Sequence, residues 1–162
     1  MRRTLTILGV MAGLFSGCAH AADTTSVAAD GTVTIRPGEA FEITFPSRDD
    51  LTHPQFSRVL DHIDSKVPGY HRPDPNTPPP TGPALMSFEF KQQGGMLVLE
   101  VRNDTGVSIK YDATMIVRGQ SAHTSICPIF PGTMGLEQWG DPIEMLKLSG
   151  FRTADPSNWA CN

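Results

Sequence analysis

The stretch A-L-M-S-F-E-F-K-Q-Q-G-G-M-L-V-L-E-V, residues 84–101, decides the fold class. Its first half alternates between apolar and polar residues, which is the two-residue period of a β-strand with one face on a core. Gly94-Gly95 is a turn dipeptide. The second half is apolar on both faces, which is typical of a central strand. The stretch therefore predicts two consecutive strands of a β-meander.

Further strand-like segments lie on both sides of this stretch. Upstream, T-V-T-I-R from Thr32 and E-A-F-E-I-T-F at 39–45 alternate in the same way and are joined through a Pro-Gly turn. Downstream, we expect N-D-T-G at 103–106 to close a hairpin onto an alternating strand. Residues 126–130 and 143–151 are two more candidate strands.

About seven short strands indicate a mainly β domain that spans residues 32–162, a single antiparallel β-sandwich. Immunoglobulin-like architecture is the leading expectation for it.

One segment has a different period. From Phe56 to Ile63, apolar residues recur at i, i+3, i+4 and i+7, and Pro68-Gly69 follows. This pattern predicts a short inserted α-helix at about 53–66. The Pro-rich loop 72–83 comes next, and its composition favours an extended polyproline II connection over a helix.

The N-terminus has the pattern of an export signal. Arg2 and Arg3 precede an uncharged apolar run of about eleven residues, which is too short for a membrane-spanning helix of roughly 20. Ala19-His20-Ala21 follows as a small-x-small cleavage site, so we expect a signal peptide at 1–21 and a periplasmic or secreted protein. The small, polar residues 22–31 are expected to form a flexible N-terminal arm.

A second cleavage pattern overlaps the first. Phe15-Ser16-Gly17-Cys18 approximates the bacterial lipobox, in which the cysteine is acylated and becomes the new N-terminus. Each buried CH2 of an acyl chain contributes about 0.8 kcal/mol to membrane attachment. The alternative localisation is thus a membrane-anchored lipoprotein with Cys18 as the lipidated residue. A membrane is a partner of this chain only in that case.

The chain has three cysteines. If Cys18 is removed or acylated, Cys127 and Cys161 remain as an even pair, and an oxidising compartment favours a disulfide between them. That bridge would hold the C-terminal residues against the domain.

The charge balance limits the classes of partner. The chain has 13 Lys and Arg against 17 Asp and Glu, and removing the signal peptide takes away two arginines and no acid. A net acidic protein without a basic cluster is not attracted to nucleic acid or to an anionic membrane surface. No zinc-type Cys/His spacing, phosphate loop or dinucleotide fingerprint occurs, so we expect neither a metal nor a cofactor.

The segment C-P-I-F-P-G-T-M-G-L-E-Q-W-G-D-P-I-E, residues 127–144, is both apolar and rich in Pro and Gly. We expect a loop that folds back over the end of the sandwich as a lid, held by the disulfide. The alternative is an exposed binding surface. In that case Phe130 and Trp139 are the candidate anchors, flanked by Glu137 and Asp141, because aromatic residues dominate interface hot spots.

Two functions fit these residues. The first is an exported, non-enzymatic envelope protein that binds another protein or an envelope component through its loops; an inhibitor or immunity-type protein is one such physical type. The second is a small exported hydrolase or thiol enzyme that uses Cys127 or Ser121 with His123, since a nearby imidazole activates a thiol or hydroxyl. Residues 119–123 begin like a nucleophile elbow but lack its last glycine, so we expect a polar loop there.

Overall fold

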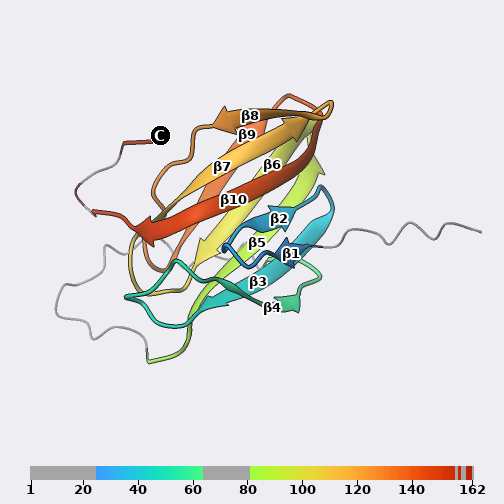
Figure 1. The fold of residues 1–162 in the computed structure, drawn as a ribbon. Coiled ribbons are helices and arrows are strands. Elements are labelled where there is room, and N and C mark those ends of the chain that lie inside the picture. Colours follow the sequence, from blue (N-terminus) through green and yellow to red (C-terminus); the bar gives the residue numbers. More distant parts are fainter. Residues whose placement is uncertain (1–24, 64–80, 156, 158–159, 162) are drawn as a thin grey trace, which may run out of the picture.

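Two antiparallel sheets form the part of the chain that the computed structural model describes, residues 25–63, 81–155, 157 and 160–161. Sheet A has the strand order β1-β2-β10-β7-β8, and sheet B has the order β4-β3-β5-β6-β9 (Figure 1). The strands are β1 (Ser26–Val27), β2 (Val33–Ile35), β3 (Glu39–Phe45), β4 (Gln55–Val59), β5 (Ala84–Gln93), β6 (Met96–Asn103), β7 (Ile109–Val117), β8 (Gln120–Thr124), β9 (Thr133–Trp139) and β10 (Ile143–Thr153). No α-helix lies within the described residues.

One hydrophobic core joins the two sheets. The ring of Phe88 in sheet B lies 5.3 Å from that of Phe41 in the same sheet and 6.3 Å from that of Tyr111 in sheet A, centroid to centroid. Phe151 of sheet A stands edge-on to Phe88 at 6.5 Å. The largest fully buried side chains come from both sheets and from the segment after β8: Tyr111, Phe41, Phe88, Phe90, Ile35, Ile43, Met86, Leu99, Ile109, Ile126, Leu146 and Leu148. The fold is therefore mainly β and sandwich-like, as predicted.

The strands predicted from residues 84–101 are confirmed. β5 and β6 pair in an unbroken antiparallel register in which Phe88 faces Val101 and Phe90 faces Leu99. Gly94 and Gly95 make the turn between them with φ of 60° and 84°, values that favour glycine. Both strands are internal to sheet B, which confirms the expectation that residues 96–101, apolar on both faces, form a central strand.

The predicted helix at 53–66 is wrong over the residues that the structure describes there. Residues 55–59 form β4 at the edge of sheet B and pair with β3. Phe56 stacks on Phe41 at 6.3 Å, whereas Val59 is 75% exposed, so the apolar positions do not form one buried face. Pairing with β3 supplies the backbone hydrogen bonds that so short a helix would have had to form alone.

The predicted flexible arm is paired where the structure describes it. Ser26–Val27 forms β1 against β2, with Ser26 opposite Thr34. The Thr25 hydroxyl donates to Glu39 Oε2 at 2.6 Å. Residues 22–24, the predicted signal peptide 1–21 with Cys18, and most of the Pro-rich loop lie outside the described residues.

The N-D-T-G turn at 103–106 exists but does not close a hairpin. β6 ends in sheet B at Asn103 and β7 begins in sheet A at Ile109, so the turn carries the chain from one sheet to the other. The buried Asn103 side chain accepts from the Thr105 amide at 3.0 Å and donates to the carbonyls of Val107 and Ile129, both at 2.8 Å. These bonds satisfy backbone groups that a hairpin would have paired across its strands.

Candidate functional site

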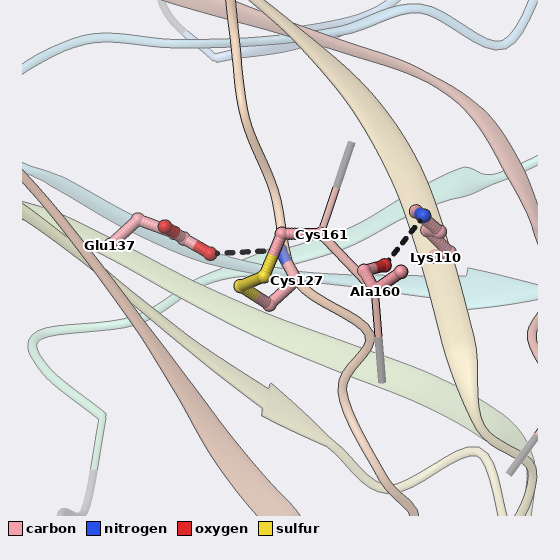
Figure 2. Close-up of a disulfide and its surroundings, with 5 residues drawn as sticks. All are labelled: Lys110, Cys127, Glu137, Ala160 and Cys161. Carbon is pink, nitrogen blue, oxygen red and sulfur yellow. Dashed lines mark hydrogen bonds between the residues drawn. A yellow bond between two sulfur atoms is a disulfide. The ribbon is translucent and has the colours of Figure 1, made fainter. Parts of the chain in front are cut away.

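The predicted disulfide is present. Cys127 and Cys161 are bonded, with their Cα atoms 4.1 Å apart and a sequence separation of 34 (Figure 2). Close by, Lys110 Nζ of β7 donates to the Ala160 carbonyl at 2.9 Å. The bridge therefore joins the residues before the end of the chain to the segment that follows β8.

That segment folds back over the core, as expected for the first part of the predicted lid. Ile126 is fully buried and Ile129 is 4% exposed. Ile129 and Ile109 exchange two backbone hydrogen bonds of 2.9 and 2.8 Å, an isolated bridge in place of the strand predicted at 126–130. The lid, residues 125–132, thus packs apolar side chains into the core, and most of its apolar surface is not offered to a partner.

Residues 133–139, expected to be irregular, form strand β9 instead. The inward-facing Gly135 explains how a strand fits here: a Cβ on it would lie 2.8 Å from Ile129 Cδ1, so the lid packs directly on the backbone of β9. The glycines of this segment predict irregular structure, but Gly135 instead makes room for the lid against β9.

The four candidate binding residues do not form one surface. Trp139 packs edge-on to Phe90 at 6.2 Å and donates from Nε1 to Thr124 Oγ1 at 2.8 Å, which ties β9 to β8. Phe130 is half-buried in the lid, and Asp141 is exposed in the turn before β10. Glu137 lies beside the disulfide, where its Oε1 accepts from the Cys127 amide at 3.2 Å (Figure 2).

Burial governs the ionisation of Glu137. It raises the pKa of the Glu137 carboxyl above its ordinary value, and the hydrogen bond from the Cys127 amide only partly opposes this. Burial also raises the pKa of the Tyr111 hydroxyl, and the negative charge of Glu137 adds to the shift. Among the described residues, the Tyr111 hydroxyl has no hydrogen-bond partner. The Glu137 carboxyl and the Tyr111 hydroxyl are therefore two polar groups that burial withdraws from water and that interact electrostatically.

The raised pKa of Glu137 predicts a pH-dependent stability. Because the folded protein holds this proton more tightly than the unfolded chain, protonation of Glu137 stabilises the fold. This stabilisation is fully present below the ordinary pKa of about 4.5 and is lost as the pH rises through the pKa of Glu137 in the folded protein. Glu137→Gln keeps an acceptor for the Cys127 amide and removes the titration. We expect urea unfolding between pH 4 and 8 to show that the free energy of unfolding of the variant rises relative to that of the wild type as the pH increases. A difference in free energy that does not change with pH would contradict the assignment.

The candidate nucleophiles of an enzyme are not brought together as a catalytic set. The sequence predicts a polar loop at 119–123, whereas residues 120–124 form β8, on which Ser121 and His123 are both exposed. Successive residues on this strand face opposite sides, so these two side chains share one face at a two-residue spacing. The sulfur of Cys127 is bonded to Cys161.

A cleft opens beside β8. It has a volume of about 500 Å³, and the residues that line it are Met115, Val117, Arg118, Gln120, Ser121, Ala122, Asp141 and Pro142. Met115 and Val117 are half-buried residues packed against the core, so the wall of the cleft on β7 is apolar. No sequence motif marks this site, because its residues come from the β7–β8 hairpin and from the turn before β10.

Among the described residues, no three His, Cys, Asp or Glu side chains lie close enough together to hold a metal ion. The same part of the chain contains no helix with the length and apolarity needed to cross a membrane.

Comparison with protein-family models, with curated proteins and with solved structures finds no match to this chain. No relative therefore assigns a role to the cleft or to the residues around it.

Proposed function

We propose that this chain is an exported, non-enzymatic envelope protein that binds a partner protein at the β8 side of a disulfide-closed sandwich. The observation that carries the proposal is the coincidence of the exposed end strand β8 with the cleft beside Ala122. An end strand beside a cleft with one apolar wall combines backbone groups for affinity with a pocket for specificity.

The predicted immunoglobulin-like architecture and export signal belong to the same proposal. A small acidic domain that closes with a disulfide suits an oxidising compartment outside the cytoplasm. An inhibitor or immunity-type protein has this physical type. Of the four candidate binding residues Phe130, Trp139, Glu137 and Asp141, only Asp141 lines the cleft, so we place the binding surface at β8.

Site-specific photo-crosslinking in the native host tests the proposal. A photoreactive amino acid is placed at Ser121, and the control carries it at Val59, which is 75% exposed on the edge strand β4 of sheet B and lines neither the cleft beside β8 nor the hollow beside Gln55. We expect one discrete crosslinked protein from Ser121 and none from Val59. Equal crosslinking from both edges, or none from Ser121, would overturn the proposal.

A small exported hydrolase or thiol enzyme remains the alternative function, and one measurement tests whether Cys127 can serve it as a nucleophile. A thiol enzyme needs a free Cys127, whereas the structure bonds it to Cys161. Thiol titration of the folded, unreduced protein should therefore find neither Cys127 nor Cys161 reactive. A reactive Cys127 would favour the enzyme.

A further inference from the structure

We infer that β8 binds an extended segment of the partner as an additional strand of sheet A, with one large, uncharged apolar side chain of that segment entering the cleft beside Ala122. This inference rests on the proposed function and specifies how the partner is recognised.

The geometry of the β7–β8 hairpin fixes which backbone groups face outward. Arg118 and Gly119 have φ of 50° and 72°, and they form a two-residue loop between the paired residues Val117 and Gln120. Positive φ at both positions is the mark of a type I′ turn, in which the residues that flank the loop are hydrogen-bonded to each other. Because the bonded pairs then alternate, Gln120, Ala122 and Thr124 bond to β7.

The residues between them have their backbone groups on the other side. Ser121 and His123 therefore direct their N–H and C=O groups away from β7, and in the described structure β8 pairs with no other strand. An added strand would meet two donors and two acceptors at the correct spacing.

β8 lacks the devices that usually protect a strand at the end of a sheet. Natural edges are blunted by Lys, Pro, bulges or very short length. β8, Q-S-A-H-T, contains no proline and no Lys, Arg, Asp or Glu, and its register with β7 has no shift. The other three edges differ: β1 has two residues, β4 has a register shift and carries Arg58, which is paired with Glu42 at 3.2 Å, and β9 carries the acidic residue Glu137.

The cleft determines the side chain that the added strand presents. A residue opposite Ala122 projects to the same face as Ala122 itself, which is the face of the cleft. There it would face the cleft, whose lining includes the apolar residues Met115, Val117 and Pro142. Arg118 and Asp141 also line the cleft and carry opposite charges, so the site favours neither a cation nor an anion. The chemistry selects an apolar side chain such as Leu, Met or Phe.

The same geometry disfavours a second copy of this chain as the occupant. Two β8 strands that pair antiparallel about Ala122 would place one alanine opposite the other. An alanine methyl fills little of a cleft of about 500 Å³. The occupant that fits is therefore a segment of a different protein with a larger residue at this position.

Seven-residue peptides that are uncharged except at one variable position test the inference on the whole chain without its predicted signal peptide. The probes are Ac-T-S-T-X-T-S-T-NH2 with Leu, Met, Phe, Asp or Lys at X, and the readout is amide hydrogen exchange by NMR. We expect the Leu, Met and Phe peptides to slow exchange at Ser121 and His123, with at least about tenfold lower Kd than the Asp and Lys peptides. The amide of Ala122, which bonds to β7, should change little.

Three results would overturn the inference. The first is unchanged exchange at Ser121 and His123 up to the solubility limit of every peptide. The second is equal affinity for the Leu and Asp peptides. The third is protection of these two amides that grows with protein concentration in the absence of peptide, which would identify a second copy as the occupant.

Matched variants separate the backbone contact from the cleft. Ser121→Pro removes an N–H that β7 does not use, so we expect at least a tenfold loss of peptide affinity with little change in Tm. Ser121→Thr keeps the N–H, so its loss of peptide affinity should be smaller than that of Ser121→Pro. Ala122→Phe fills the cleft from within and should also abolish binding, which keeps the test valid if Ser121→Pro folds poorly. Peptide affinity that survives both Ser121→Pro and Ala122→Phe would contradict strand addition.

The two proposals fail in different ways. If crosslinking at Ser121 captures a partner but Ser121→Pro and the peptides have no effect, the partner binds on the β8 side without adding a strand. If crosslinking at Ser121 yields nothing, the proposed function fails, whatever the peptides show.

Discussion

Replacing both bridging cysteines, Cys127→Ser with Cys161→Ser, should lower the free energy of unfolding by about 3–4 kcal/mol. The bridge spans 34 residues of sequence. A crosslink that closes a loop of this length removes conformational entropy from the unfolded chain, and the chain-entropy model gives roughly 4 kcal/mol as its upper value. Urea unfolding of the variant and of the wild type measures the difference directly.

The structure also predicts which residues become less protected from hydrogen exchange when the disulfide is removed. The lid keeps its own anchors without the disulfide, because Ile129 is buried and exchanges two hydrogen bonds with Ile109. On the other side of the bridge, the Ala160 carbonyl keeps the hydrogen bond from Lys110, a side chain with several rotatable bonds. Hydrogen exchange should therefore accelerate near Ala160 and much less at Ile129.

Reduction of the wild-type protein is the matched control for the double variant. Both lack the crosslink between positions 127 and 161, so the reduced wild type should unfold at nearly the same urea concentration as the variant. An unfolding midpoint that reductant does not change would show that the disulfide contributes nothing measurable.

Phe88→Ala should cost about 3–5 kcal/mol, which is the usual range for truncating a buried phenylalanine. Phe88 is fully buried and touches rings from both layers: Phe41 in sheet B, and Tyr111 and Phe151 in sheet A. These neighbours belong to paired strands, so they cannot collapse into the cavity without disturbing the sheets.

Phe56→Ala is the control for this truncation. Phe56 has the same side chain but lies on the edge strand β4 and is 43% exposed. We expect a loss of less than about 1.5 kcal/mol, since much of its ring already contacts water. Chemical denaturation of both variants gives the comparison, and equal losses would mean that the sheets do not share one core centred on Phe88.

Internal strands could be predicted from the sequence, either by strict alternation or by an apolar run. β3, β5 and β6 are internal strands of sheet B, and their inward residues are apolar because they meet the core. Edge strands do not carry this signal as clearly. β4 has every residue exposed, so its few apolar residues matched a helical spacing by chance, and pairing with β3 decided its conformation.

The candidate site also has one part that the sequence predicts, the disulfide, and one part that it does not, the cleft. The disulfide followed from the cysteine count, since removing Cys18 leaves a single pair. The cleft did not follow, because it depends on which strand ends sheet A and on the turn at Asp141 approaching the β7–β8 hairpin. Sequence patterns describe one segment at a time, whereas this site exists only once three segments are placed in space.

The position of β10 has a consequence for how the chain reaches this fold. β10 pairs on one side with β2 and on the other with β7, and Leu146 faces both Ile35 and Met115. In a chain that emerges N-terminal end first, from a ribosome or through a membrane pore, β2 has no partner in sheet A except β1 until β10 arrives. Contacts between segments so distant in sequence form slowly, and strand edges that wait for them are prone to aggregate. Sheet B can assemble early from neighbouring strands, but the core between the layers closes only when β10 has arrived.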